Sequence, residues 1–202
     1  MTPAVHLVDD EAPVRDALTF LLQSHGLDVF SYATGPDFLS QVKAQALRGC
    51  AVLDVRMEPM SGLQVHDELR LRGVSMPVLF LTGHGDIPMA VDALQKGAVD
   101  FLEKPFSGDY LVQRVLRALA LEAAHHASLQ QQAQTRERLH GLTERELAVM
   151  RLVAAGKLNK VIADELSVAV RTVEVHRSRV FEKLQVRSAA ELATLLAGLA
   201  LD

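Results

Sequence analysis

Apolar residues follow two different patterns along this chain of 202 residues. In the first half, short apolar runs alternate with segments whose apolar residues have helical spacing. The runs predict strands at residues 4–8, 28–32, 50–55, 77–82 and 99–102, and the segments predict helices at residues 12–25, 36–47, 61–72 and 87–96. This strict alternation is typical of a parallel sheet with helices on both faces. We therefore predict a doubly wound, five-stranded α/β domain.

The second half has a purely helical pattern. An apolar stripe that begins at residue 111 continues without Gly or Pro to residue 140, and the Gln- and Arg-rich part at 128–138 offers few core residues. Shorter helices are predicted at residues 143–155, 159–166, 169–184 and 188–199, and the first and last open with the capping-box pairs Thr143/Glu146 and Ser188/Glu191. The domain prediction is residues 1–120, a long helical linker at 121–140, and a small all-α, four-helix domain at 141–202 that contains a helix-turn-helix candidate.

Charge is divided unevenly between the two halves. Residues 1–122 carry 10 Lys/Arg and 16 Asp/Glu, a net of −6, whereas residues 123–202 carry 11 and 9, a net of +2. Such asymmetry suggests two domains with different partners. The single cysteine, Cys50, excludes a disulfide within the chain and fits a reducing compartment. No basic-then-apolar leader and no long apolar stretch is present, so we expect a cytoplasmic protein without a membrane span.

Polar residues with related chemistry follow the predicted strands. Asp9 and Asp10 follow the first run, Asp54 the third, Thr82 the fourth and Lys104 the fifth. In an open parallel sheet these positions meet at the carboxyl ends of the strands, where ligands bind. Three carboxylates, one hydroxyl and one ammonium can together bind a hard cation and an anionic phosphoryl group.

These residues lie in motifs that resemble a known family. The first half resembles the receiver domain of two-component response regulators in four stretches, Val8-Asp9-Asp10, Asp54-Val55-Arg56-Met57, Thr82-Gly83-His84-Gly85-Asp86-Ile87-Pro88 and Asp100-Phe101-Leu102-Glu103-Lys104-Pro105-Phe106. The second half resembles a LuxR-type helix-turn-helix in Asn159-Lys160-Val161-Ile162-Ala163 and Thr172-Val173-Glu174-Val175-His176-Arg177. The resemblance is to the FixJ-like branch of the NarL/FixJ family, and it implies a flavodoxin-like receiver fold.

The resemblance implies a role for each residue at the strand ends. Asp54 would be the phosphoacceptor. Transfer of a phosphoryl group to this carboxylate would need neutralisation of the negative charge of the phosphoryl and carboxylate oxygens, which suits Mg²⁺. Mg²⁺ would be bound directly by Asp10, mostly through water by Asp9, and also by Asp54 and the backbone carbonyl of Arg56. His84 would be a loop residue.

Three further features follow from the same resemblance. Thr82 would donate a hydrogen bond to a phosphoryl oxygen, and Lys104 would pair with the phosphoryl group, or with Asp54 before the group arrives. Thr82 and Phe101 would form a conformational switch. The Lys104–Pro105 bond is expected to be cis.

The helix at residues 169–184 is the predicted recognition helix, which enters the major groove in a helix-turn-helix protein. Its buried face is predicted to comprise Val173, Val180, Phe181 and Leu184. The candidate base readers on the opposite face are Arg171, Glu174, Val175 and Ser178. The candidate phosphate contacts are Lys160, Thr172, Arg179 and Lys183.

The chain departs from the family pattern at three places. Glu58 and Pro59 stand where the family usually has Pro and then often Gly, which changes the backbone restriction and the charge beside the acceptor. Ala169 stands where a capping Ser is common, so the recognition helix starts without a side-chain cap. Glu174 replaces the Lys common in relatives, so their operator sequence does not transfer.

The resulting prediction is a transcription regulator activated when a sensor histidine kinase phosphorylates Asp54. The expected partners are that kinase, double-stranded promoter DNA, a second copy of the chain after phosphorylation, and RNA polymerase. The chain is not expected to be an enzyme beyond slow autodephosphorylation.

Three alternatives remain open from the sequence. A haloacid-dehalogenase-like phosphatase also uses a strand-end Asp, but it needs another Asp where this chain has Arg56. A ligand-sensing LuxR-type regulator uses Trp-rich pockets, and this chain has no Trp. A phosphorylation-independent receiver would not need the full acidic set.

Overall fold

The computed structural model describes residues 2–42, 47–83 and 87–199. The chain divides into two compact units, Met1–His126 and Ala127–Asp202, and the division falls inside one continuous helix, α5 (Gly108–His140). Across the described residues, no helix is long and apolar enough to span a bilayer.

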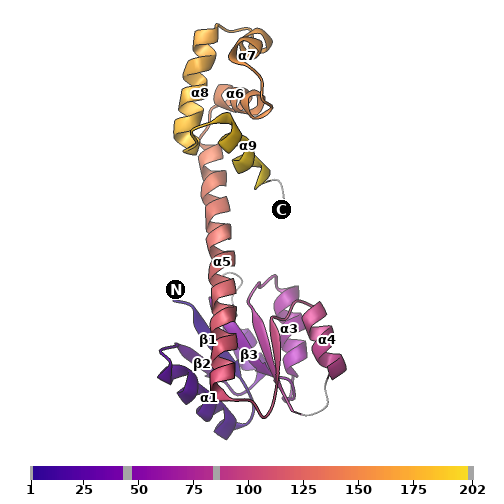
Figure 1. The fold of residues 1–202 in the computed structure, drawn as a ribbon. Helices are drawn as coiled ribbons and strands as arrows, with labels where there is room; N and C mark the ends of the chain where they lie inside the picture. Colours follow the sequence, from indigo (N-terminus) through magenta and orange to yellow (C-terminus); the bar gives the residue numbers. More distant parts are fainter. Residues whose placement is uncertain (1, 43–46, 84–86, 200–202) are drawn as a thin grey trace. The chain divides into compact units, whose positions relative to one another are not determined.

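The first unit is a parallel sheet with helices on both faces (Figure 1). Its strands are β1 (Ala4–Val8), β2 (Val29–Tyr32), β3 (Gly49–Asp54), β4 (Val78–Thr82) and β5 (Asp100–Glu103). Its helices are α1 (Ala12–Ser24), α2 (Gly35–Gln41), α3 (Gly62–Leu71), α4 (Ile87–Gln95) and the first part of α5. The strand order is β2-β1-β3-β4-β5, and every neighbouring pair is parallel. The predicted five-stranded doubly wound fold is confirmed.

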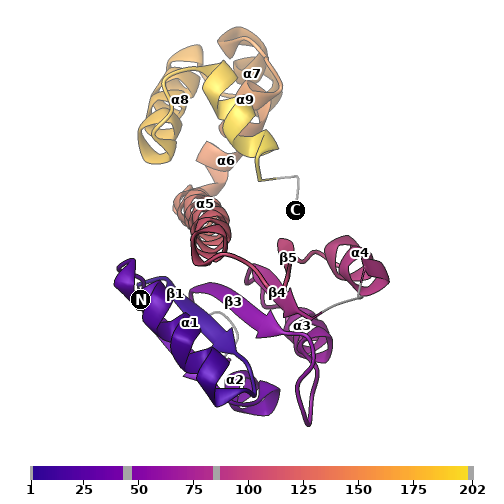
Figure 2. The same ribbon diagram turned by 60° about the horizontal axis from the view of Figure 1, so that its bottom comes forward.

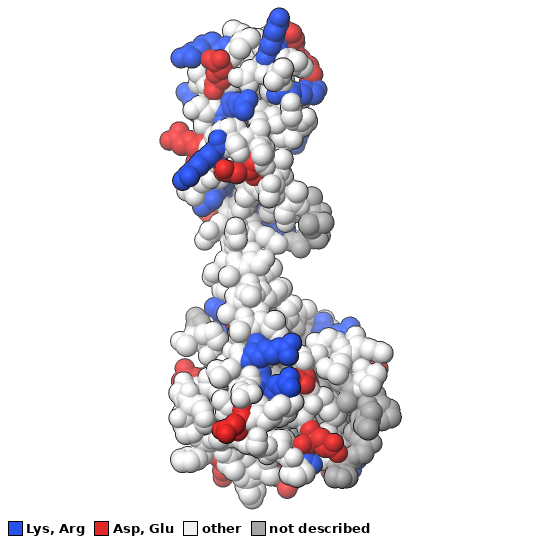
Figure 3. All heavy atoms as spheres, in the orientation of Figure 1, with Lys and Arg blue, Asp and Glu red and all other residues white. Residues whose placement is uncertain are grey.

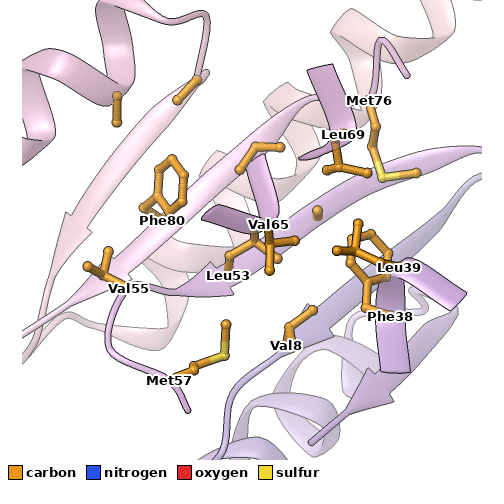
Figure 4. Packing of buried hydrophobic residues seen from close by; sticks show 14 of the residues in the cluster. Val8, Phe38, Leu39, Leu53, Val55, Met57, Val65, Leu69, Met76 and Phe80 are labelled. Carbon is orange, nitrogen blue, oxygen red and sulfur yellow. The ribbon is translucent and has the colours of Figure 1, made fainter. Parts of the chain in front are cut away.

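Two apolar clusters attach the helices to the sheet. One face of the sheet packs against α1 and α5, through residues such as Leu22 and Val115, and the other packs against α2, α3 and α4 (Figure 2). Figure 4 shows this second cluster, in which Val65 lies beside Leu53 of β3 and Phe38 lies beside Leu39. The three central strands are buried along their whole length because helices cover both of their faces.

The end of α2 corrects one sequence prediction. We predicted a helix over residues 36–47, but α2 ends at Gln41 and Leu47 is not helical, while residues 43–46 lie outside the described part. Val42 has an extended backbone and its side chain is buried in the cluster of Figure 4. The extended backbone of Val42, whose β-branched side chain has a lower helix propensity, ends the helix before the predicted boundary.

A salt bridge connects α5 to the residue that precedes β3. Arg48 donates from Nε and Nη2 to the two carboxylate oxygens of Glu122, at 2.8 and 3.0 Å. The Glu122 side chain is largely buried, so this bidentate pairing neutralises a carboxylate that has little contact with water. The pair fixes α5 against the sheet near the end of the first unit.

The second unit is a small helical domain around one apolar core. It contains α6 (Glu144–Ala154), α7 (Asn159–Leu166), α8 (Val170–Leu184) and α9 (Ala189–Ala197), together with the end of α5. Its core includes Val149, Ile162 and Val173. The predicted four-helix arrangement is confirmed, although α9 ends two residues before the predicted boundary at residue 199.

One of the two predicted capping boxes forms completely and the other only in part. At Thr143 both halves form, because its hydroxyl accepts from the Glu146 N–H and Glu146 accepts from the Thr143 N–H. At Ser188 only the hydroxyl half forms. The Glu191 carboxylate accepts instead from the Arg187 N–H, at 2.8 Å, because the preceding residue offers a competing backbone donor.

Candidate functional site

Two buried carboxylates and one ammonium meet at the carboxyl edge of the sheet. Lys104 Nζ lies 2.7 Å from Asp54 Oδ1 and 3.3 Å from Asp9 Oδ2. Asp9 is completely buried and Asp54 is 7% exposed. The sequence predicted the contact with Asp54, whereas the contact with Asp9 is an addition from the structure. One cation therefore holds the ends of β1 and β3 together.

Local backbone geometry orients both carboxylates. Asp54 Oδ2 accepts the Arg56 N–H at 2.8 Å, and Asp9 Oδ1 accepts the Glu11 N–H at 2.9 Å. In each case the carboxylate bonds the backbone two residues later, as Asp commonly does in turns. Each side chain thus keeps one oxygen on its own loop and turns the other toward Lys104.

Lys104 and Thr82 are connected through the main chain. The Lys104 N–H donates to the Thr82 carbonyl at 2.7 Å, immediately after β5 pairs with β4. The Thr82 side chain is buried and its hydroxyl donates to the Gly83 carbonyl at 3.0 Å. The predicted cis bond between Lys104 and Pro105 is present. The backbone of Lys104 is therefore tied directly to the end of β4.

Burial and charge act against each other in this cluster. Burial raises the pKa of Asp54 and the Asp9 charge adds to this, whereas the hydrogen bond and charge of Lys104 lower it by less. For Lys104, burial alone would lower the pKa, but Asp54 and Asp9 together outweigh it and raise the pKa. Lys104 therefore remains an ammonium ion beside a carboxylate that is more basic than an ordinary Asp.

The remaining predicted metal ligands lie at the edge of the cluster. The side chains of Asp10 and Arg56 are exposed, and no three His, Cys, Asp or Glu side chains within residues 2–42, 47–83 and 87–199 gather closely enough to hold a metal ion by themselves. The donor chemistry nevertheless fits Mg²⁺. Asp9 and Asp54 already converge on one cation, and Mg²⁺ is commonly held by one or two carboxylates with water in the other positions.

Sequence reasoning missed Gly62, which lets α3 approach the end of β3. A Cβ at this position would overlap the carbonyl oxygen of Asp54, and the Gly62 N–H donates to the Val55 carbonyl at 3.2 Å. The sequence signal was a glycine directly after the helix cap Ser61, whose capping box with Gln64 is complete. Because Gly62 has no side chain, the start of α3 can pack directly against the backbone carbonyl of Asp54.

The predicted switch residue Phe101 lies on β5 opposite Phe80 of β4. The ring centroids are 6.0 Å apart and the rings are tilted by 49°. Phe101 is only partly buried, so its ring lies between the core and the surface. His84 lies outside the described residues.

The second candidate site is the outer face of α8. Val173, Val180 and Leu184 are buried as predicted, while Phe181 is only partly buried. The Arg177 guanidinium lies 5.2 Å from the centre of the Phe181 ring. The helix begins at Ala169 without a side-chain cap, as expected from the sequence.

The predicted base readers share the exposed face of α8. Arg171, Glu174, Val175 and Ser178 are all exposed, and Arg171 pairs with Glu174 at 3.1 Å. Among the predicted phosphate contacts, Lys160, Arg179 and Lys183 are exposed and Thr172 is partly buried. The Lys183 ammonium also bonds Glu146, at 2.7 Å. Figure 3 shows Lys and Arg side chains interspersed with acidic ones over this unit.

Arg177 contacts Asn159, and the sequence did not predict this contact. Arg177 Nη1 donates to Asn159 Oδ1 at 2.8 Å, which ties the middle of α8 to the first residue of α7. Both residues belong to the motifs quoted above, but their spacing gave no sign of a contact. The two helices of the helix-turn-helix are thus held together by a polar bond as well as by the core.

The pH dependence of the second unit is expected to follow Glu146. Hydrogen bonds from Lys183 and Thr143 lower the pKa of Glu146 from its usual 4.5 to about 2. Because the folded-state pKa is depressed, the stabilisation is fully present above about pH 4.5 and is lost as the pH falls toward 2. Hydrogen exchange at the Thr143 amide should show the loss. Glu146→Gln should flatten the pH dependence, and an unchanged dependence in this variant would assign the effect to another group.

Comparisons with known proteins identify a family for each half of the chain. Residues 5–116 match the family described as response regulator receiver domain, and residues 140–196 match the bacterial regulatory proteins of the luxR family. The chain is 46% identical over 197 residues to the C4-dicarboxylate transport transcriptional regulatory protein DctR of Rhodobacter capsulatus, which covers 96% of this chain and 100% of that protein. It is 41% identical over 198 residues to the transcriptional regulatory protein FixJ of Azorhizobium caulinodans, covering 97% and 93%.

A solved structure extends the similarity to three dimensions. The response regulator StyR has a TM-score of 0.87 and 39% sequence identity, and the comparison covers 98% of this chain and 99% of that one. The relatives therefore share both halves of the chain and their order, which a match to one domain alone would not establish.

Proposed function

We propose that a sensor histidine kinase switches this protein by phosphorylating Asp54. The chain belongs to the two-component response regulators that combine a receiver domain with a LuxR-type DNA-binding domain. The observation that carries the proposal is the Lys104 ammonium between Asp54 and the buried Asp9. The charge and hydrogen bond of Lys104 oppose the rise in the Asp54 pKa that burial causes, at the ligand-binding edge of the sheet.

The proposed chemistry begins with the Asp54 carboxylate. Its oxygen attacks the phosphorus of a phosphohistidine, the P–N bond breaks, and the imidazole leaves. Lys104, which contacts a carboxylate oxygen of Asp54 before the transfer, then pairs with the phosphoryl oxygens instead. Thr82 turns its hydroxyl from the Gly83 carbonyl to a phosphoryl oxygen. Charge stabilisation by positioned groups is the main catalytic contribution in phosphoryl transfer.

Asp9, Asp10, Asp54 and the backbone carbonyl of Arg56 would hold Mg²⁺ at this edge. The ion would supply positive charge that offsets the negative charge of the acceptor and phosphoryl oxygens. Asp9 and Asp54 already share a cation, and Asp10 would turn its exposed carboxylate toward the metal. Hydrolysis of the aspartyl phosphate is proposed to be slow, with Glu58 adding a negative charge near the acceptor.

The proposed output is transcriptional control through α8. Movement of Thr82 would let Phe101 repack and change the surface formed by α4 and β5, where two receivers would pair. The dimer would present two α8 helices to successive half-sites of promoter DNA, and RNA polymerase would be the further partner. Functionally, we divide the chain into receiver 1–120, linker 121–140 and DNA-binding domain 141–202, and we place it in the cytoplasm, where kinase output and promoter DNA meet.

The phosphoacceptor assignment predicts a single site of labelling. Incubation with acetyl phosphate and Mg²⁺ should add one acid-labile phosphoryl group to the parent and to Asp16→Asn, whose carboxylate is exposed on α1. Asp54→Asn should remain unlabelled, because the central carboxylate is gone while the fold keeps an isosteric side chain. Intact-protein mass spectrometry measures this. Equal labelling of Asp54→Asn and the parent would show that another residue accepts the group.

Receiver pairing should increase when Asp54 carries a phosphoryl group. Sedimentation at fixed protein concentration, with and without beryllofluoride as a mimic of the aspartyl phosphate, should show a shift from monomer toward dimer. Asp54→Asn should show no shift. An unchanged equilibrium in the parent would contradict coupling through dimerisation.

Base readers and phosphate contacts on the DNA-binding unit should respond differently to mutation. Lys160→Ala should weaken binding to all sequences and reduce the salt dependence by roughly one contact. Glu174→Ala should change the preferred base at one position and cost about 1–3 kcal/mol on the selected site. Selection of binding sites from random DNA tests both variants. If Lys160→Ala changed the preferred sequence and Glu174→Ala did not, the orientation of α8 would be wrong.

A further inference from the structure

Lys183 lies in the last turn of α8, where three helices meet at its ammonium group. Nζ lies 2.7 Å from Glu146 Oε2 near the start of α6, and 3.1 Å from the backbone carbonyl of Gly141. The sequence pattern grouped Lys183 with exposed phosphate contacts. In the structure the Lys183 side chain is 40% exposed, and its ammonium bonds a carboxylate that belongs to the domain.

Glu146 is an unusual partner because it is buried and already has a structural role. Its side chain is only 3% exposed, and Oε2 also accepts from the N–H and the hydroxyl of Thr143, at 2.9 and 3.0 Å. The same carboxylate therefore completes the capping box of α6 and neutralises Lys183. A buried carboxylate that loses its cation is strongly destabilised, because little water can replace the cation.

Gly141 marks the end of α5. Its N–H donates to the carbonyls of Glu137 and Arg138, both at 3.2 Å, which closes the last turn of that helix. The Gly141 carbonyl is thus the first one beyond α5, and Lys183 donates to it. One ammonium joins the end of α5, the start of α6 and the end of α8.

The contacts of Lys183 matter more because the start of α8 has no side-chain cap. Ala169 provides no side-chain cap, so the first turn of α8 lacks the hydrogen bond that a capping side chain would supply. The middle of the helix is tied to α7 by Arg177 and Asn159. Lys183 is the corresponding polar tie at its far end.

We propose that Lys183 is a positioning residue, which sets the orientation of α8 relative to α6 and the end of α5 and does not neutralise a DNA phosphate. This inference rests on the proposed role of α8 as the recognition helix. Under this proposal the bond to Glu146 holds the exposed ammonium on the domain, so that Lys183 neutralises no phosphate and releases no counterion. Its loss should therefore reduce discrimination between sequences and leave the salt dependence of binding unchanged.

The test compares Lys183→Met with Lys160→Met in the full chain. Binding to a duplex selected by the parent, and to a random duplex of equal length, is measured over a range of salt concentrations. Lys160→Met should reduce the slope of log K against log salt by about one on both duplexes. Lys183→Met should keep the parental slope and lower affinity several-fold for the selected duplex only. Loss of about one unit of slope in Lys183→Met would overturn the proposal.

Hydrogen exchange provides a readout that does not depend on DNA. The Thr143 amide, which donates to Glu146, should exchange at least about tenfold faster in Lys183→Met and at the parental rate in Lys160→Met. Parental exchange in Lys183→Met would also overturn the proposal. If the parent itself failed to bind any duplex, the proposed function would fail, while the exchange result would still decide whether Lys183 anchors the three helices.

Glu146→Gln separates the two roles if Lys183→Met folds poorly. A positioning role predicts weaker discrimination in Glu146→Gln, because the amide holds the ammonium less firmly, with no gain in salt dependence. A phosphate-binding role predicts the opposite, a steeper salt dependence, since the released ammonium could reach DNA. Lys183→Arg keeps a cation and should restore part of the discrimination lost in Lys183→Met.

Discussion

The placement of one ammonium between two buried carboxylates is the constraint on which the first unit depends. Asp9 and Asp54 end neighbouring strands, and two such charges could not be buried together without a cation. Lys104 supplies it from β5, two positions further along the sheet, and so reaches across the end of β4. Only a sheet that brings these strand ends to one edge satisfies all three charges.

The same geometry explains how a change at Asp54 would be transmitted. Lys104 is bonded through its backbone to the Thr82 carbonyl, so the groups at the ends of β4 and β5 respond together. Phe101 packs against Phe80 within this strand pair. Under the proposed function, a phosphoryl group would draw Lys104 and the Thr82 hydroxyl toward itself, at the ends of the two strands where the half-buried Phe101 ring lies.

The helix α5 belongs to both units and has a polar tie in each. Arg48 and Glu122 hold it to the sheet of the first unit, and the Gly141 carbonyl at its end accepts from Lys183 in the second. Between Arg117 and Arg136 the only Asp, Glu, Lys or Arg is Glu122. The middle of α5 thus connects two anchored ends with few charges of its own, and the face in Figure 3 shows a largely uncharged surface there.

Much of the fold follows from the sequence because apolar runs and polar strand ends are local signals. Asp54, Thr82 and Lys104 could be placed by asking where each run stops. The end of α2 could not, because Val42 is drawn into a core that forms only when distant elements pack. Gly62 was missed because its role depends on the approach of α3 to the Asp54 carbonyl.

The sequence pattern also could not predict where the charged ends of long side chains lie. Lys183 lies at the surface as predicted, but its ammonium bonds the buried Glu146, which lies 37 residues earlier in the chain and could not be identified from spacing. Asp10 shows the opposite case, since it follows the strand as predicted yet leaves its carboxylate exposed. Spacing identifies the face on which a residue lies, whereas charge pairing across the fold decides where its end group goes.

The most direct test of the phosphorylation switch is the affinity of the full chain for its selected duplex, measured with and without beryllofluoride at one salt concentration. The parent is expected to bind more tightly when the mimic is present, and Asp54→Asn is expected to show the same affinity in both conditions. Equal tightening in Asp54→Asn, or identical affinities of the parent with and without the mimic, would contradict control of DNA binding through Asp54.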